Sequence, residues 1–266
     1  MMKRPDLALR MGGVAVLLVG VLLIIIVGDL FSISPVEVPE RARDLSANAG
    51  FGLLLIGLFA VFLYSSRAFP EEYTEAFLIT EGQNMGRYLS SLNLEGNGIY
   101  MPARGRLTAE RVFVPLEKKE MEVPPVADGT VFNSGALGPS LGVSLIPPGK
   151  GLVDVVDSNS SSNFADHSIS EGTEAMEKLG KGTGMFGRIS LRDRGGVLEL
   201  RITHTRFRGL CDQLWEEYGD LHRQVGCPAC SAVLCAAARL VKSDLRILDA
   251  KREEREVIYE LRRGSD

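Results

Sequence analysis

The sequence is poor in the residues on which most metal- and cofactor-dependent enzymes rely. It has three histidines, one tryptophan and four cysteines among 266 residues. Its glycine-rich stretch Gly180–Gly184 lacks the G-x4-G-K-[ST] pattern of a Walker phosphate loop. A conventional histidine-based metal enzyme and a P-loop nucleotide hydrolase are therefore not expected. On balance the sequence favours a protein without enzymatic activity, and we expect no cofactor.

An excess of basic charge is also missing. The chain carries 30 Lys and Arg against 34 Asp and Glu, for a net charge of −4. Because positions 1–66 hold as many basic as acidic residues, the whole acidic excess belongs to positions 67–266. A region with that balance has no general attraction to nucleic acid. Nucleic acid is therefore not an expected partner.

Charge is absent from two long stretches near the start, Met11–Gly28 and Leu45–Ser66. A helix needs roughly 20 apolar residues to cross the ~30 Å hydrocarbon core of a bilayer. The stretches predict a transmembrane hairpin, and the bilayer is its expected partner. No A-x-A-like site follows Gly28, so the first span is interpreted as an uncleaved anchor rather than a signal peptide.

The basic residues that flank these spans predict their orientation. Lys3, Arg4 and Arg10 precede the first span and Arg67 follows the second, whereas the connection between them is more acidic than basic. We expect an integral protein of the cell membrane with both termini in the cytoplasm. The expected parts are a tail at 1–10, spans at 11–32 and 46–66 around an external loop at 33–45, a juxtamembrane helix at 67–94 and a soluble domain at 95–266.

Neither span has an ionisable residue in its middle, which excludes a proton relay within the hairpin. Small residues occur in both, including Gly13 and Gly20 in the first and Gly50, Gly52 and Gly57 in the second. Such residues allow close helix approach in lipid. Two alternatives stay open, pairing of the two spans with each other or a homodimer contact through the membrane helices.

Hydrophobic periodicity predicts an α+β fold for the soluble domain. Short strands are expected at Ile99–Pro102 and Arg111–Leu116, and a short helix at Ser168–Leu179. The last third follows the order strand, strand, helix, helix, strand, strand. Its segments are Phe186–Leu191, Val197–Thr203, Phe207–His222, Pro228–Lys242, Leu245–Ala250 and Glu256–Leu261. The two hairpins predict one antiparallel sheet covered by helices.

All four cysteines fall within 25 residues, at Cys211, Cys227, Cys230 and Cys235. Cys227-Pro-Ala-Cys230 opens a predicted helix, where the helix dipole lowers a thiol pKa. Three interpretations remain: plain packing of small apolar side chains, thiol redox chemistry, or a metal site that His204 or His222 completes. Cys-x2-Cys-x4-Cys is not a standard metal spacing, and a cytoplasmic location disfavours structural disulfides.

The chain resembles a family of uncharacterised archaeal membrane proteins. The resemblance rests on the basic tail, the two spans, Asn97-Gly-Ile-Tyr-Met-Pro102, Arg111-Val-Phe-Val-Pro115, Ile146-Pro-Pro-Gly149 and Gly226-Cys-Pro-Ala-Cys-Ser231. No activity is assigned to that family, so the resemblance does not indicate one. The C-terminal part also resembles vinyl-reductase-type sensor domains that bind small hydrophobic ligands. Those domains have cysteines in the last hairpin, and Leu245–Leu261 has none.

Two functions of different class follow. The first is a membrane-anchored cytoplasmic domain for binding, sensing or scaffolding, with a protein partner possible. The alternative is a thiol- or metal-dependent domain centred on Cys227 and Cys230.

Overall fold

The chain forms two units, Met1–Pro70 and Glu71–Asp266. The computed structural model describes residues 14–22, 48–59, 71–119, 126–134, 141–159, 163–204, 207–254 and 256–264. The predicted tail at 1–10 and external loop at 33–45 lie outside these residues. The outer parts of both predicted spans do so as well.

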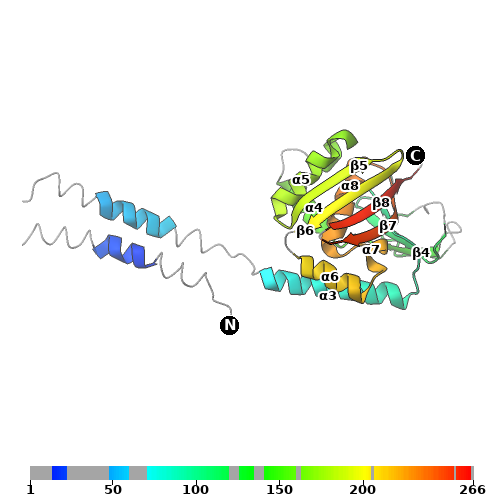
Figure 1. Ribbon diagram of the computed structural model, residues 1–266, viewed down its shortest axis with the longest axis horizontal. Helices are drawn as coiled ribbons and strands as arrows, with labels where there is room; N and C mark the ends of the chain where they lie inside the picture. The colour runs from blue at the N-terminus through cyan, green and yellow to red at the C-terminus, as the bar shows by residue number, and fades with distance from the viewer. Residues whose placement is uncertain are drawn as a thin grey trace, which may run out of the picture. The chain divides into compact units, whose positions relative to one another are not determined.

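Two antiparallel helices make up the described part of the first unit, one at 14–22 and one at Asn48–Phe59 (Figure 1). They meet at two glycines. A Cβ added at Gly20 would lie 3.0 Å from the backbone nitrogen of Leu54, and one added at Gly57 would lie 2.8 Å from that of Leu17. Gly52, in contrast, has nothing within 4 Å of an added Cβ. Within the described residues, Gly20 and Gly57 therefore serve the pairing of these two helices.

Away from this contact, the two helices expose large apolar side chains. Phe51 is 59% exposed, Ile56 62%, Phe59 63% and Leu18 63%. Exposed apolar patches are typical of surfaces that contact another protein or a membrane. The described helices are shorter than the roughly 20 residues that a span requires, so the two-span topology stays a prediction.

One described helical stretch, Leu221–Val241, has the length and apolar composition of a membrane span. Of its most apolar window, 89% is buried inside the protein. Packing in the domain core accounts for that composition, because a buried core helix is apolar on all sides.

The second unit is built on one eight-stranded, entirely antiparallel sheet with the strand order β3-β4-β2-β1-β7-β8-β6-β5 (Figure 1). The strands are β1 (Ile99–Met101), β2 (Arg111–Pro115), β3 (Phe132–Ser134), β4 (Leu141–Leu145), β5 (Phe186–Asp193), β6 (Val197–His204), β7 (Leu245–Glu253) and β8 (Glu256–Arg263). The α+β class with an antiparallel sheet is thus confirmed. The two predicted hairpins, β5–β6 and β7–β8, form one half of the sheet, and β1–β4 form the other.

Helices cover one face of this sheet. They are α3 (Glu71–Ser91), α4 (Lys150–Ser158), α5 (Gly172–Thr183), α6 (Arg208–Glu217), α7 (Leu221–Gln224) and α8 (Pro228–Val241), with short 3-10 turns at Phe164–Asp166 and Ile169–Glu171. Helix α8 is the central one, since twelve of its residues are buried. Its small side chains allow the neighbouring strands and helices to approach closely. Helices α3 and α6 lie side by side (Figure 1).

Strands β1 and β2 are buried on both faces. Tyr100 and Val112 point into the main core beneath the helices, whereas Ile99, Met101 and Phe113 belong to a second, smaller core. Since successive strand residues point to opposite faces, the two cores lie on opposite sides of the sheet. The short predicted strands are therefore the middle of the sheet rather than its edge.

Several boundaries differ from the sequence-based expectation. The predicted helix Phe207–His222 is two helices, because α6 ends at Glu217 and α7 begins at Leu221. The juxtamembrane helix predicted at 67–94 is helical from Glu71 to Ser91, and 67–70 lie outside the described residues. Helix α4 was not expected at all.

Glycines in two of the quoted motifs permit close contacts with the helical layer. A Cβ at Gly98 would lie 1.7 Å from the carbonyl oxygen of Gln224, at the end of α7. One at Gly149 would lie 2.1 Å from the backbone nitrogen of Ala232 in α8. Only glycine fits at either position, because a side chain would collide with backbone. The two loops thereby pack directly against α7, which carries His222, and against α8, which begins with the Cys-Pro-Ala-Cys motif.

An ion-pair network joins α4 to α8 at the opposite end of α8 from its N-terminus. Arg239 donates from Nε to Glu110 at 2.6 Å, from Nη1 to Asp157 at 2.5 Å, and from Nη2 to Asp154. Burial alone would raise the pKa of Glu110 and of Asp154, but hydrogen bonds from Arg239 and, for Asp154, Lys150 bring both below their ordinary values. The network is structural, since all its cations and carboxylates pair with one another.

Candidate metal centre

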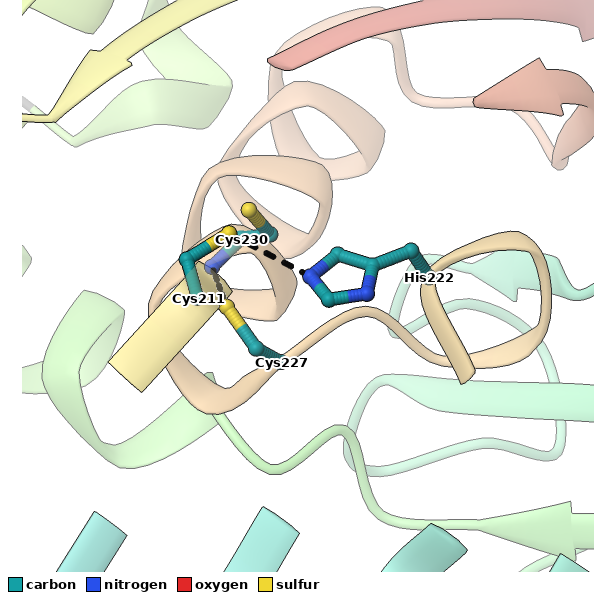
Figure 2. A group of neighbouring side chains, drawn as sticks. All are labelled: Cys211, His222, Cys227 and Cys230. Atoms are coloured by element: carbon teal, nitrogen blue, oxygen red, sulfur yellow. Dashed lines mark hydrogen bonds between the residues drawn. The ribbon is translucent and has the colours of Figure 1, made fainter. Parts of the chain in front are cut away.

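Three cysteines and one histidine meet at the N-terminus of α8. Figure 2 shows Cys211, His222, Cys227 and Cys230 around one point. Their ligand atoms all lie within 4.8 Å of one another. Cys211 comes from α6, His222 from α7, and Cys227 and Cys230 from the start of α8. We call these four residues the Cys3His cluster.

The local sequence explains how α8 presents two sulfurs together. Gly226 adopts a positive φ of 71° and turns the chain into the helix. Cys227 is the N-cap and Pro228 takes the first helical position, where its missing N–H costs nothing. The backbone N–H of Cys230 donates to Sγ of Cys227 at 3.4 Å. The Cys-Pro-Ala-Cys motif therefore holds its two sulfurs over the same helical turn.

His222 enters the cluster from the short helix α7. Its Nε2 lies 3.3 Å from Sγ of Cys211, and its ring packs against Trp215 with 4.2 Å between ring centroids. Nδ1 is buried and has no hydrogen-bond partner among the described residues. The aromatic contact, rather than a hydrogen bond to Nδ1, thus fixes the orientation of this imidazole.

The electrostatics of the cluster favour one thiolate. Burial alone would raise the pKa of Cys227, but hydrogen bonds from Cys211, Cys230 and His222 bring it well below its usual value. The hydrogen bond with Cys227 raises the pKa of Cys211, and burial raises that of Cys230. The negative charge is therefore concentrated on Cys227, with its neighbours acting as donors.

The surroundings of the cluster are dry. All four residues are at most 2% exposed. The Tyr259 hydroxyl is buried without a hydrogen-bond partner among the described residues, and burial followed by the charges of the cluster sulfurs raises its pKa. The Tyr100 hydroxyl donates to the carbonyl of Val225 at 2.6 Å and lies 2.8 Å from Ser231 Oγ. Within the part of the chain that the structure describes, the four cluster residues are thus almost completely shielded from solvent.

The donor set fits zinc. Structural zinc is held tetrahedrally by cysteine and histidine, with Zn–S bonds of about 2.3 Å and Zn–N bonds of about 2.0 Å, which puts ligand atoms roughly 3.5–3.8 Å apart. The spread of up to 4.8 Å in the cluster needs only small side-chain rotations to reach that geometry. All four positions are supplied by protein, as in structural rather than catalytic sites.

The sequence candidates separate into two groups. Cys211, Cys227 and Cys230 come together, and His222, one of the two histidines considered as helpers, joins them. Cys235 does not belong to the group. It lies further along α8, where burial and then the charge of the Glu110 carboxylate raise its pKa to about 12. The side chain of His204 lies outside the described residues.

The spacing that carries the cluster is Cys211-x10-His222-x4-Cys227-x2-Cys230. The sequence interpretation used Cys-x2-Cys-x4-Cys, which counts Cys235 in place of the residues before α8. Reading upstream from Cys227 through the short helix α7 would have found the same four ligands. Residue type was the misleading signal, because Cys235 follows Cys230 at the same x4 spacing at which His222 precedes Cys227.

Comparison with known proteins identifies a family but no activity. No curated protein and no solved structure matches the chain. The family model DUF7982, a domain of unknown function, matches residues 15–207, about three quarters of the chain. The match stops before Cys211, so the whole Cys3His cluster lies beyond it. The match extends from the first apolar helix to the end of β6. The chain therefore belongs to the DUF7982 family of unknown function.

Proposed function

We propose that this protein is a membrane-anchored binding or scaffolding protein whose cytoplasmic α+β domain is stabilised by one zinc ion. The observation that carries the metal assignment is the convergence of three thiols and one imidazole within 4.8 Å. Cys211, His222, Cys227 and Cys230 would each supply one ligand, through Sγ or Nε2. The proposal joins the two sequence-based hypotheses in one molecule.

Ligand chemistry supports zinc over other metals. Three soft thiolates with an imidazole suit Zn²⁺, whereas Mg²⁺ and Ca²⁺ prefer oxygen ligands. Helix α8 adds to the thiolate character, because the positive end of its dipole and the Cys230 N–H both face Cys227. When bound, zinc would lower the thiol pKa values further and hold the sulfurs as thiolates.

Burial supports a structural role for the metal. A catalytic zinc keeps one position open for water or substrate, and a redox thiol must meet its partner at the surface. The residues of the Cys3His cluster are at most 2% exposed, and the cluster has four protein donors. Its effect would be to tie α6 and α7 to the start of α8, three elements that are joined by irregular turns.

The first unit supports the anchor. Helices 14–22 and Asn48–Phe59 pack together through glycines and expose apolar side chains on the outside. That arrangement suits a helical hairpin in lipid, where small residues replace the hydrophobic drive for association. The basic residues at the flanks support an orientation with both termini, and with them the domain, in the cytoplasm.

Metal analysis of the purified full chain in neutral detergent tests the zinc assignment. We expect close to one zinc per chain, and almost none in Cys227→Ser or Cys230→Ser. Cys235→Ser is the matched control, because it removes an equally buried thiol from the same helix outside the cluster. It should keep its zinc.

A second measurement is needed because a variant that loses its metal can also lose its fold. Replacement of zinc by Co²⁺ in the unaltered protein should give the visible spectrum of a tetrahedral, thiolate-rich site. Wild-type protein without stoichiometric metal, in which native-state titration finds four inert thiols, would show that the cysteines are only packed. A single fast-reacting, strongly acidic thiol would instead favour redox chemistry.

A further inference from the structure

Helix α3 exposes a row of aromatic side chains on the side that faces away from the domain core. Tyr73 is 63% exposed, Phe77 78% and Tyr88 39%. Among the large apolar side chains that the structure describes, Phe77 has the greatest exposed fraction. Since each residue advances a helix by about 100°, the three positions lie within about 60° of one another around the helix axis. They therefore form one stripe along α3.

The opposite side of α3 is committed to the domain, because it packs against α6, α7 and α8. A Cβ added at Gly82 would overlap the side chain of Leu214, and one added at Gly86 would overlap the ring of Tyr218. Leu89 is buried and belongs to the main core. These contacts fix the rotation of α3 about its own axis, so the aromatic stripe is held outward.

The exposed residues between the aromatic rings are mostly neutral. We define the outer strip of α3 as Tyr73, Phe77, Thr80, Glu81, Asn84 and Tyr88, which are all exposed. Its only charged member is Glu81, and the Thr80 hydroxyl donates to the carbonyl of Ala76 within the helix at 2.9 Å. Tyrosine is enriched at the boundary between lipid head groups and acyl chains, because its ring is apolar and its hydroxyl is polar. The outer strip has that composition.

Charged residues beside the strip are turned towards α6. The Nε of Arg87 donates to the hydroxyl of Tyr218 at 3.2 Å. An oxygen of the Glu75 carboxylate lies 3.2 Å from the position that a Cβ on Gly209 would occupy. A partner that recognises charge would find little to bind on the strip itself, whereas a neutral, partly apolar surface would fit it.

The chain keeps the start of α3 close to the predicted anchor. The second predicted span ends at Ser66, and α3 begins at Glu71. Five residue steps cover at most about 18 Å even when fully extended. The polar head-group region of each leaflet is roughly 5–8 Å thick. Tyr73, in the first turn of α3, is therefore within reach of the head groups.

We propose that the outer strip of α3 lies on the head-group region of the bilayer that holds the anchor. The inference rests on the membrane anchor of the proposed function, because only an anchored chain keeps a bilayer beside α3. Phe77 and Tyr88 are about 16 Å apart along the helix axis, so contact at both means that α3 runs along the membrane surface. Since the other side of α3 is fixed to the domain, this contact sets which face of the domain is turned to the lipid.

Added tryptophans in the full chain test the contact. The chain is placed in phosphatidylcholine nanodiscs, one chain per disc, with or without bromine on the acyl chains, because bromine quenches only nearby indole rings. Neutral lipid is used because α3 begins with two glutamates, and the wild type, whose single tryptophan is Trp215, gives the baseline. In Phe77→Trp and in Tyr88→Trp, bromine should remove at least about half of the added fluorescence, as for an indole at head-group depth.

Phe132→Trp is the matched control, because Phe132 is an aromatic residue on the edge strand β3 that is 61% exposed. Its added fluorescence should respond to aqueous iodide and not to bromine. A chain that does not co-purify with the discs would contradict the anchor itself. A chain held in the discs whose substitutions on α3 respond to iodide alone would overturn the α3 contact and leave the anchor standing. Protection from iodide that appears only in discs with two chains would assign the strip to a second copy, which also overturns the contact with lipid.

Discussion

Cys227 has two roles at the start of α8. Its Sγ accepts a hydrogen bond from the Cys230 N–H, as a serine or aspartate would at an N-cap, and the same thiol is the one whose pKa its cluster neighbours lower. A serine at this position would supply an oxygen that can still cap the helix, but it would remove the soft sulfur ligand. The Cys227→Ser variant therefore separates the two roles, because it retains the helix cap and loses the metal ligand.

At Gly98, even the smallest substitution, to alanine, should destabilise the domain. Gly98→Ala puts a methyl group 1.7 Å from the Gln224 carbonyl oxygen, and the resulting shift should destabilise the fold by roughly 1–3 kcal/mol or more. Gly151→Ala is the matched control, because its Cβ meets nothing within 4 Å and it lies in α4. The control should gain up to about 1 kcal/mol.

Thermal or denaturant unfolding measures both changes. An unchanged midpoint for Gly98→Ala would show that the loop after α3 can move away from α7 without cost.

All four site residues were named from the sequence, His222 as one of two candidate helpers, but a local pattern explains the placement of only two of them. Cys227 and Cys230 are fixed by one helical turn, which spacing alone describes. Cys211 and His222 reach the cluster only because α6 ends at Glu217 and the chain turns before α7. A single long helix, as predicted for this region, would not specify that arrangement.

Among the elements, α8 organises the domain through both of its ends. Its first turn holds the cysteines and its last turn holds Arg239, whose side chain is 14% exposed. The Arg239 network joins α8 to α4 and to the loop before β2. Its polar groups are satisfied by one another, and removal of the single arginine would leave Glu110, only 6% exposed, without its main partner.

Arg239→Met should therefore lower stability by roughly 3 kcal/mol at neutral pH. The folded-state pKa values of Glu110 and Asp154 lie below their ordinary values of 4.5 and 3.8. Their contribution is present above those ordinary values and is lost as pH falls through the lowered ones. The wild type should thus lose stability below about pH 4.5, and the variant should lose less over the same range.

Unfolding free energies measured from pH 7 to pH 3 check this difference. Parallel curves for the two proteins would contradict a role for the network in acid sensitivity.

Element types were predicted well where a pattern repeats over many residues, as in β5, β6, β7, β8 and α8. Helix α4 was missed because Pro147, Pro148 and Gly149 immediately before it were interpreted as part of an irregular tract. The proline pair ends a strand, and the helix begins directly after the glycine that contacts α8. Tertiary contact at Gly149, rather than local propensity, decides that boundary.

At the scale of the whole molecule, the predicted membrane anchor can be tested separately from the soluble domain. The bounds given to the tail, the spans and the loop remain predictions. The full chain should stay in the membrane pellet after an alkaline carbonate wash, because two apolar helices would hold it in lipid. A tag at the C-terminus should be protected from protease in intact cells. Release of the chain by carbonate would contradict the anchor, and cleavage of the tag would contradict the orientation.

The contact between α3 and α6 links the start of the domain to the helix that carries Cys211. A Cβ at Gly82 would overlap the Leu214 side chain, and one at Gly86 the ring of Tyr218, so α6 is seated directly against the backbone of α3. Helix α6 also carries Cys211, and α3 is the first described element after the predicted spans. If the proposed zinc were released and α6 moved, α3 would have to move with it, because no side chain at Gly82 or Gly86 separates the two helices.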